Sequence, residues 1–281
     1  MSIRSIIVCG AGTMGSGIAQ VAARHGHETA LYDLDPAALE RAERSIREAW
    51  QGLVEKGRMS DAQRAAALEK LRFVRDLQGA DLVIEAIVER LDAKIALFHS
   101  LAEVCTAEAI FVSNTSSLSI DALQEALPHP ERVAGLHFFN PAPLMKLVEV
   151  VRGRQTDPGV LATLEALVSG WEKVPVVCKD APGFIVNRVA RPFYLEALRL
   201  AQAGGDYASI DRILEASGFR MGPFRLMDLI GNDVNLAVTR SLYEAYGKAT
   251  RFQPSPLQEA LVARGDLGRK TGKGYYSYTS T

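Results

Sequence analysis

Short apolar runs alternate with amphipathic stretches along the first two thirds of the chain. Runs at residues 6–8, 29–32 and 81–89 have the length and the β-branched content of buried strands. Further strands are predicted at residues 109–113, 132–139, 147–151 and 174–178. Strands that alternate with helices indicate a parallel sheet covered on both faces. Because residues 147–151 follow the preceding strand after a short connection, we expect that strand to be antiparallel.

The pattern changes at residues 179–183, and beyond them no convincing strand is found before the C-terminal tail. Helical periodicity instead predicts helices at about residues 184–202, 207–216, 223–246 and 256–263. A chain of this length can form two domains, each with its own core. We therefore predict an α/β domain at residues 1–182 and an all-helical domain at residues 183–281.

A helical hairpin is predicted inside the first domain, at about residues 37–72, where a short crossover would normally suffice. Its helices cover residues 37–57 and 60–71, and Ser60 is expected to cap the second. Basic residues alternate with glutamates along it, at Arg41, Arg44, Arg47, Lys56 and Arg58. This pattern is typical of a solvated, ion-paired helix face. The alternative is that Lys56 and its neighbours bind a phosphorylated ligand.

Three glycines follow the first predicted strand at an informative spacing. Gly10 permits a tight turn, Gly12 lets the backbone approach a pyrophosphate, and Gly15 lets the next helix pack closely on the strand. The N-terminus of that helix would receive the anion. Asp33 ends the second strand, where a carboxylate can accept hydrogen bonds from an adenosine ribose. This order predicts a dinucleotide site in a Rossmann-type, doubly wound, mostly parallel sheet.

Polar side chains collect at the carboxyl ends of the predicted strands, the edge at which a doubly wound sheet binds its ligands. They are Asp33, Glu89, residues 114–117 and His137. Histidine exchanges a proton near neutral pH, although a lone histidine would more simply be a hydrogen-bonded core residue. Glu149 interrupts the next apolar strand, and a returning strand would bring it beside His137 to orient the imidazole. Ser116 and Ser117 offer hydroxyls nearby, although such serines are more often loop or cap residues.

The overall composition excludes several classes of protein. A formal net charge of -1 over 281 residues provides no general attraction to nucleic acid or to a membrane surface. No apolar run approaches the roughly 20 residues needed to span a bilayer, and the first strand begins too early for a signal peptide. Cys9, Cys105 and Cys178 are too few and too far apart for a disulfide framework. We therefore expect a soluble, cytoplasmic protein, and no metal site is predicted.

Seven longer motifs extend over both predicted domains. They are GAGTMGSGIAQ at residues 10–20, EAIVE at 85–89, SNTSSL at 113–118, GLHFFNPAPLMKLVEVV at 135–151, DAPGFIVNR at 180–188, MGPF at 221–224 and KTGKGYYSY at 270–278. In these motifs the sequence resembles the short-chain L-3-hydroxyacyl-CoA dehydrogenases, which include bacterial 3-hydroxybutyryl-CoA dehydrogenases. The resemblance covers essentially the whole chain and implies an NAD-dependent enzyme that acts on an acyl-CoA substrate.

The resemblance also implies individual roles. The catalytic acid–base pair corresponds to His137 and Glu149, the pair chosen from the strand pattern, and Ser116 and Asn187 would bind the substrate's 3-oxygen. Because Asn187 lies beyond the hinge at residues 182–183, closure would complete the site. NAD contacts are implied at Gly10, Ala11, Gly12, Thr13, Met14, Gly15, Asp33, Glu89, Lys94, Ser116, Asn140 and Lys270.

CoA contacts are implied at Ser116 and, on the hairpin, at Lys56. A further CoA-binding serine of the family is replaced here by Ala49, which departs from the family pattern. The implied reaction transfers a hydride between C3 of the acyl group and the nicotinamide ring. His137 would remove or return the proton of the 3-hydroxyl group, and Glu149 would offset the positive charge that develops on it.

The helical domain carries more apolar residues than a small domain can bury by itself. The excess lies on the predicted helices at residues 184–202 and 229–247. We therefore predict a homodimer formed mainly through this domain, and the family resemblance implies the same. The expected partners are an acyl-CoA and a second copy of the chain, with no nucleic acid and no membrane.

Two other functions stay open. One is a hydroxy-acid dehydrogenase that does not use CoA, such as the gulonate dehydrogenase branch that resembles this family. The intact SNTSSL and GLHFFNPAP motifs favour the acyl-CoA branch over it. The other is a non-catalytic NAD-binding protein, which would not need His137, Glu149, Ser116 and Asn187 together.

Overall fold

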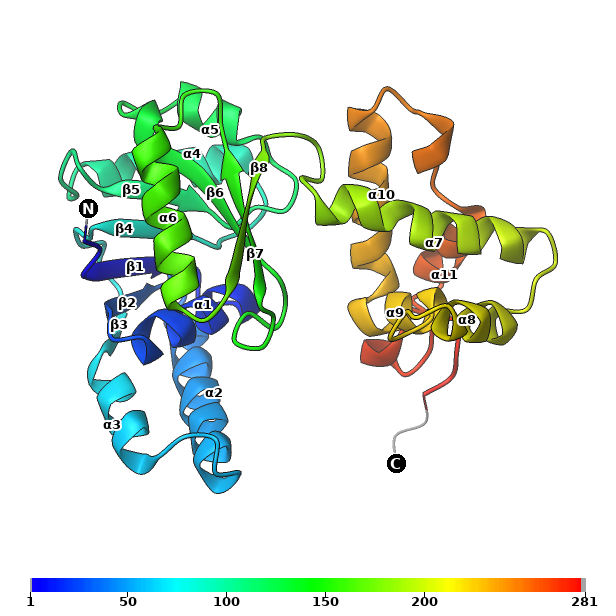
Figure 1. Ribbon diagram of the computed structural model, residues 1–281, viewed down its shortest axis with the longest axis horizontal. Coiled ribbons are helices and arrows are strands. Elements are labelled where there is room, and N and C mark those ends of the chain that lie inside the picture. The colour runs from blue at the N-terminus through cyan, green and yellow to red at the C-terminus, as the bar shows by residue number, and fades with distance from the viewer. Residues whose placement is uncertain (1, 279–281) are drawn as a thin grey trace. The chain divides into compact units, whose positions relative to one another are not determined.

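The computed structural model describes residues 2–278 of the chain (Figure 1). Between Ala181 and Pro182 the chain divides into two compact units. The first unit contains a mixed sheet with its helices, and the second is built of helices. Each unit has its own cluster of buried apolar side chains.

The sheet of the first unit follows the strand order β3-β2-β1-β4-β5-β6-β7-β8 among the described residues. Its strands are β1 Ser5–Cys9, β2 Glu28–Tyr32, β3 Leu71–Val74, β4 Leu82–Glu85, β5 Ile110–Ser113, β6 Val133–Phe138, β7 Leu147–Arg152 and β8 Val174–Lys179. All neighbouring strands are parallel except β6 and β7, which are antiparallel. The predicted antiparallel strand and the Rossmann-type, mostly parallel sheet are thus confirmed.

Helices cover both faces of this sheet (Figure 1). They are α1 Thr13–Arg24, α2 Pro36–Glu55, α3 Asp61–Glu69, α4 Leu91–Ala102, α5 Ile120–Glu125 and α6 Pro158–Gly170, with a 3-10 turn at Pro130–Arg132. Successive side chains of a strand point to opposite faces. On β5, Ile110 and Val112 belong to the apolar cluster that α1 and α6 share, whereas Phe111 packs edge-on against Phe98 of α4. The alternation within one strand therefore supports both helical layers.

The inserted hairpin consists of α2 and α3. Asp35 caps α2 by accepting a hydrogen bond from the Ala37 N–H (2.9 Å), and Ser60 caps α3 as predicted, in a capping box with Gln63. Helix α3 ends at Glu69, and β3 then pairs with β2 along the edge of the sheet. The sequence pattern predicts no strand here, because four residues are too few to show an alternation.

Strand β4 is shorter than the strand predicted at residues 81–89. It ends at Glu85, in register with Cys9 and Ser113, the last residues of β1 and β5. The Ala86 N–H still donates to the Cys9 carbonyl oxygen of β1 (2.7 Å), and the chain then leaves the sheet beside the glycine turn. Helix α4 likewise ends at Ala102 and not near residue 107, as the periodicity predicts. Both limits depend on neighbouring elements, which an apolar run cannot reveal.

The second unit has a core of aromatic and aliphatic side chains, including Tyr194, Leu198, Phe224 and Met227. Its helices are α7 Val186–Gln202, α8 Tyr207–Ala216, α9 Pro223–Ile230, α10 Asn232–Ala245 and α11 Pro256–Ala263, with 3-10 turns at Thr250–Phe252 and Arg269–Thr271. The prediction of one helix at residues 223–246 is wrong. Gly231 separates α9 from α10 with a φ of 104°, a conformation that favours glycine and ends a helix.

The C-terminal motif KTGKGYYSY is anchored to the helical unit by a buried carboxylate. Asp228 of α9 is 1% exposed and accepts hydrogen bonds from the N–H groups of Tyr275 and Tyr276 and from the Tyr278 hydroxyl, each at 3.0 Å. A Cβ on Gly274 would lie 2.0 Å from the same carboxylate. These contacts explain the glycine at position 274 and the tyrosine at position 278.

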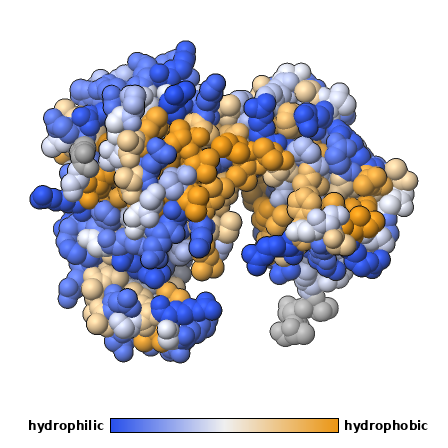
Figure 2. Space-filling model, viewed as in Figure 1, coloured by the Kyte–Doolittle hydropathy of each residue, from blue (hydrophilic) through white to orange (hydrophobic). Residues whose placement is uncertain are grey.

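Apolar side chains remain exposed on the helical unit. Figure 2 shows hydrophobic residues on its visible face around α7 and α8. The exposed members of these and the following helices include Val189, Leu200, Ile213, Leu229 and Val234. In residues 2–278, no helix is long and apolar enough to cross a membrane, and no cluster of three His, Cys, Asp or Glu side chains could hold a metal ion.

Candidate active site

The glycine turn between β1 and α1 leaves no room for side chains at two positions. A Cβ on Gly10, whose φ is 105°, would lie 2.5 Å from the Ala86 carbonyl oxygen, and one on Gly15 would lie 1.7 Å from the Gly10 carbonyl oxygen. Gly12 differs, because a Cβ there would meet nothing within 4 Å. Gly12 is the N-cap residue of α1, and as a glycine it has no side chain that could bind the first N–H groups of the helix. These N–H groups can therefore bind an anion.

A cavity of about 640 Å³ lies beside this turn. Gly10, Gly12 and Asp33 line it together with apolar side chains from α4 and from the loops after β2 and β4. The Asp33 carboxylate accepts hydrogen bonds from the N–H groups of Ala11 (2.7 Å) and Asp35 (2.9 Å), which fix its orientation. The glycine turn and the N-terminus of α1 fit the pyrophosphate of a dinucleotide. The acidic residue and the apolar cavity fit its adenosine.

His137 and Glu149 are brought together by the antiparallel pairing of β6 with β7, where they stand directly opposite each other. Nδ1 of His137 lies 2.6 Å from Oε2 of Glu149, and the two residues are 6% and 1% exposed. A carboxylate at Nδ1 holds the ring in the tautomer in which Nε2 accepts a proton. The contact between His137 and Glu149 that the sequence suggested is therefore present in the structure as a buried imidazole–carboxylate pair.

A buried ion pair lies at the ends of β4 and β5. Glu85 is fully buried, and its carboxylate accepts hydrogen bonds from Lys94 Nζ (2.6 Å), the Ser113 hydroxyl (2.5 Å) and the Ile87 N–H (2.7 Å). Lys94 is 1% exposed and also lies 3.1 Å from Glu89 Oε2. Glu85 is not among the site residues predicted from the sequence, although a charged residue within a predicted apolar strand is also the signal that identified Glu149.

Glu89 organises the loop that carries Ser116. One of its carboxylate oxygens accepts hydrogen bonds from the Thr115 hydroxyl (2.5 Å), the Ser116 N–H (3.1 Å) and the Ser117 hydroxyl (3.0 Å). Partial burial raises the pKa of Glu89, but the charge of Lys94 and these hydroxyl donors outweigh it and lower the pKa overall. The ionised carboxylate thus holds the serine loop at the same sheet edge as the glycine turn.

A second cavity, of about 620 Å³, lies between α1, α2 and the turn that follows β6. Its lining includes Gly12 of the glycine turn, Arg41 and Ala49 of α2, and Asn140 at the start of the turn. Lys56, the predicted CoA contact, is the C-cap of α2 and is not part of the lining. The cavity is large enough for an extended chain and has cationic side chains at its border.

Two predicted site residues belong to the helical unit. Asn187 is in the first turn of α7, and its carbonyl oxygen accepts a hydrogen bond from Arg191 Nε (3.2 Å). Lys270 lies in the C-terminal segment and forms an ion pair with Asp233 (2.7 Å). Their participation in one site with His137 stays a prediction.

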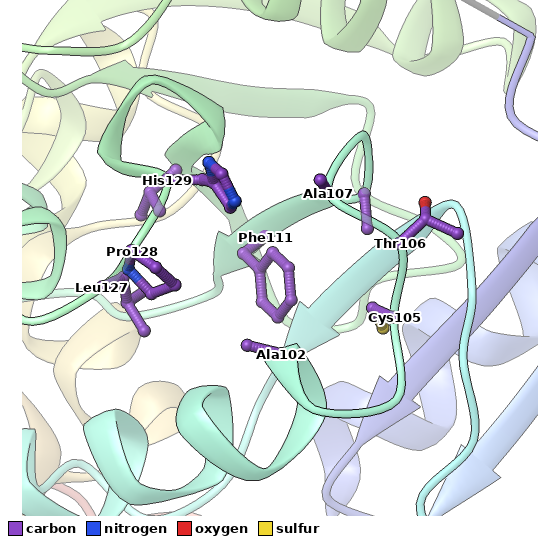
Figure 3. Close-up of a pocket in the computed structure, with 10 residues that line it drawn as sticks. Ala102, Cys105, Thr106, Ala107, Phe111, Leu127, Pro128 and His129 are labelled. Carbon is purple, nitrogen blue, oxygen red and sulfur yellow. The ribbon is translucent and has the colours of Figure 1, made fainter.

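A smaller apolar pocket of about 260 Å³ opens at the opposite edge of the sheet, where β5 and β6 begin (Figure 3). Phe111, Leu127 and Pro128 line it beside Cys105 and His129. Burial raises the pKa of Cys105, which favours the protonated thiol. None of the predicted site residues lines this pocket.

Comparison with known proteins identifies the family of both units. The family model for the NAD binding domain of 3-hydroxyacyl-CoA dehydrogenase matches residues 5–181, and the model for the C-terminal domain of the same family matches residues 183–278. The chain is 49% identical to 3-hydroxyadipyl-CoA dehydrogenase of Escherichia coli K12, with 99% of the chain and 60% of that protein covered. The chain therefore spans about 60% of the length of that relative.

Other relatives are covered over almost their full length. A probable 3-hydroxybutyryl-CoA dehydrogenase of Deinococcus radiodurans is 40% identical, with 96% of the chain and 99% of that protein covered. The crystal structure of (S)-3-hydroxybutyryl-CoA dehydrogenase from Ralstonia eutropha has a TM-score of 0.95 at 36% identity, with 99% of this chain and 100% of that chain covered. The chain therefore belongs to the 3-hydroxyacyl-CoA dehydrogenase family of NAD-dependent oxidoreductases.

Proposed function

We propose that the protein oxidises (S)-3-hydroxyacyl-CoA to 3-oxoacyl-CoA with NAD, reversibly, and that its substrates are short-chain esters such as 3-hydroxybutyryl-CoA. The observation that carries this proposal is the buried His137–Glu149 pair at the same sheet edge as the glycine turn. The relatives named 3-hydroxybutyryl-CoA and 3-hydroxyadipyl-CoA dehydrogenase support the substrate class. A 3-hydroxyl group must lose a proton as well as a hydride, and a histidine that is oriented by a carboxylate suits the proton step.

The chain's own residues would handle the proton and the 3-oxygen. NAD, when it is bound along the glycine turn, supplies the hydride acceptor. His137 removes the 3-hydroxyl proton at Nε2 during oxidation and returns it during reduction. Glu149 stabilises the imidazolium, while Ser116 and Asn187 orient the 3-oxygen. Because Asn187 belongs to the helical unit, this assignment includes a closure step.

The cofactor would be held in segments along the sheet edge. The N–H groups at the start of α1 bind the pyrophosphate, and Asp33 accepts hydrogen bonds from the hydroxyls of the adenosine ribose. Residues nearer the serine loop would contact the nicotinamide half, as the family resemblance implies. They are Glu89, Lys94, Ser116 and Asn140, with Lys270 from the helical unit.

The cavity between α1 and α2 would receive the acyl-CoA chain. Arg41 at its border offers a cation to the CoA phosphates, and Lys56 lies at the C-terminal end of the same helix. Ala49 lines the cavity without a hydroxyl, so it cannot supply the hydrogen bond of the family's serine. We therefore expect the CoA end to be held mainly by charge and by apolar contact.

Steady-state kinetics with NADH and 3-oxoacyl-CoA esters of graded chain length, including 3-oxoadipyl-CoA, tests this function. We expect turnover of the CoA esters and at least a hundredfold lower kcat/KM for the corresponding free 3-oxo acids, because the acids lack the contacts of the CoA chain. Equal kcat/KM for acids and esters would support a dehydrogenase that does not use CoA. NADH binding without turnover of any of these substrates would support a non-catalytic role.

A homodimer formed through the helical unit is part of the same proposal. The exposed apolar side chains of α7 to α10, such as Val189, Leu200 and Ile213, support it, because isolated units rarely expose a large apolar surface. Light scattering at micromolar concentration should give about twice the chain mass of 30.5 kDa. A particle of one chain mass would contradict the dimer. The cytoplasmic location stays a prediction that cell fractionation can test.

A further inference from the structure

Lys173 is a buried cation that is held by backbone groups. It precedes β8 and is 8% exposed. Its ammonium group donates hydrogen bonds to the carbonyl oxygens of Ala142 (2.6 Å) and Met145 (2.7 Å). None of the ion pairs among residues 2–278 includes Lys173. The two carbonyl dipoles therefore supply the compensation for the buried positive charge that a carboxylate usually supplies.

A buried ammonium group without a carboxylate is costly. Desolvation opposes its charge, and together with the nearby charge of Arg24 it lowers the pKa of Lys173. An apolar side chain of similar size would fill the same space without this cost. The compensating benefit must therefore come from the two carbonyl groups that the lysine holds.

Both carbonyl groups belong to the turn between β6 and β7, at residues 139–146. Residues 140–144 of this turn form one wall of the 620 Å³ cavity. The N–H groups of Leu144 and Met145 both donate to the Pro141 carbonyl oxygen (3.0 Å), which closes the turn. The Leu144 side chain is 73% exposed and provides little apolar anchoring. Ala142 packs in the apolar cluster of the first unit, and the Lys146 carbonyl oxygen accepts a hydrogen bond from the Val174 N–H (2.8 Å). Between these two points, Lys173 is the charged group that fastens the distal half of the turn to the sheet.

We propose that Lys173 is a positioning residue for the acyl-CoA substrate, because it fastens the turn that forms one wall of the cavity between α1 and α2. This inference rests on the proposed function for the identity of the ligand, an acyl-CoA. The contact between Lys173 and the turn does not depend on that function. The dinucleotide cavity is lined by the glycine turn, β2, α4 and adjoining loops, and its lining includes no residue of the turn at 139–146. Asn140 is the turn's one implied cofactor contact, and it precedes Ala142 and Met145, whose carbonyl groups Lys173 holds. Its loss should therefore weaken substrate binding much more than cofactor binding.

The catalytic pair should survive a loosened turn. His137 and Glu149 are held opposite each other by a ladder of four residue pairs between β6 and β7. That ladder ends at Phe138 and Val148, before the residues that Lys173 holds. Loss of the lysine should thus raise KM and leave kcat nearly unchanged. A residue with a purely structural role would lower the amount of folded enzyme without separating KM from kcat.

Lys173→Met tests the proposal, because it keeps the apolar stem and removes the charge. We expect KM for acetoacetyl-CoA to rise about tenfold, with kcat within about threefold and the NADH Kd within about twofold of wild type. Hydrogen exchange of the Leu144 and Met145 amides should become faster. Lys173→Arg, which keeps a cationic donor, should restore most of the affinity. Lys179→Met makes the same chemical change at the exposed end of β8 and should change none of these quantities.

Each result decides the inference. The inference is overturned if folded Lys173→Met has the KM of the wild-type protein. It is also overturned if kcat falls by the same factor by which KM rises. If Lys173→Met does not fold, Lys173→Gln retains one donor and should give an intermediate KM; failure of that variant to fold would make Lys173 a stability residue instead. If the wild-type protein does not reduce 3-oxoacyl-CoA, the proposed function fails, whereas amide exchange in Lys173→Met still reports whether the lysine fastens the turn.

Discussion

Replacement of Glu149 by glutamine is the most informative single change at the candidate site. Glutamine has nearly the same shape, and its amide oxygen can still accept the hydrogen bond from Nδ1 of His137. The change therefore removes the negative charge while it retains the neutral contact. The residue is 1% exposed and its carboxylate lies 2.6 Å from the imidazole, so solvent screens the lost charge only weakly.

The expected size of the effect follows from the charge separation. When His137 holds the substrate proton, the imidazolium and the carboxylate form an ion pair. Charge centres about 4 Å apart interact by about 4 kcal/mol at an effective dielectric constant of 20. The glutamine dipole recovers part of this, so we expect a loss of about 3 kcal/mol of transition-state stabilisation. The kcat for oxidation should fall by roughly two orders of magnitude.

Pre-steady-state and steady-state oxidation of 3-hydroxybutyryl-CoA would measure this loss, and NADH binding would serve as the internal control. We expect the NADH Kd to be nearly unchanged, because the contacts for the dinucleotide are at the glycine turn and Asp33. His137→Ala should be at least as damaging, and the double variant should be little worse than His137→Ala alone. A Glu149→Gln enzyme that keeps its kcat would refute the argument and leave Glu149 a structural residue.

Three further predictions concern the cofactor side of the site. The Asp33 carboxylate borders the dinucleotide cavity and would repel the 2′-phosphate of NADPH. We therefore expect kcat/KM with NADPH to be at least about tenfold below kcat/KM with NADH. Equal values for the two cofactors would contradict this prediction. Glu85→Gln, which leaves Lys94 with one buried carboxylate fewer, should lower the free energy of unfolding by about 2 kcal/mol or more, and an unchanged denaturation midpoint would count against the buried pair. The pKa of Glu89 is lowered in the folded protein, so its contribution to stability is present above the unfolded value of 4.5 and is lost as pH falls through the lower folded value. The stability difference between wild type and Glu89→Gln should therefore be largest near neutral pH and disappear in strong acid, as urea titrations at a series of pH values would show.

The amino-acid sequence by itself determined the features that depend on local pattern. The glycines of the first turn, the acid at the end of the second strand and the alternation of strands with helices identify the sheet and its cofactor edge, because each feature acts within about thirty residues. The placement of His137 near Glu149 was also within reach of the sequence. Two strands joined by a short connection must return antiparallel, and the charge in each apolar run marks the position.

The tertiary structure decided features that depend on neighbours far along the chain. Strand β4 ends at Glu85 because β1 and β5 end there, and β3 exists because β2 offers it an edge. Gly231 ends a helix through its backbone conformation, although the apolar periodicity continues across it.

The roles of Glu85 and Lys173 were also decided only by the fold. Glu85 is paired with a lysine nine positions away on another element, and Lys173 holds carbonyl groups about thirty positions before it. A buried charge is costly unless it is paired, so each requires a specific partner. The sequence shows that such a charge is present, but only the packed chain determines which group satisfies it.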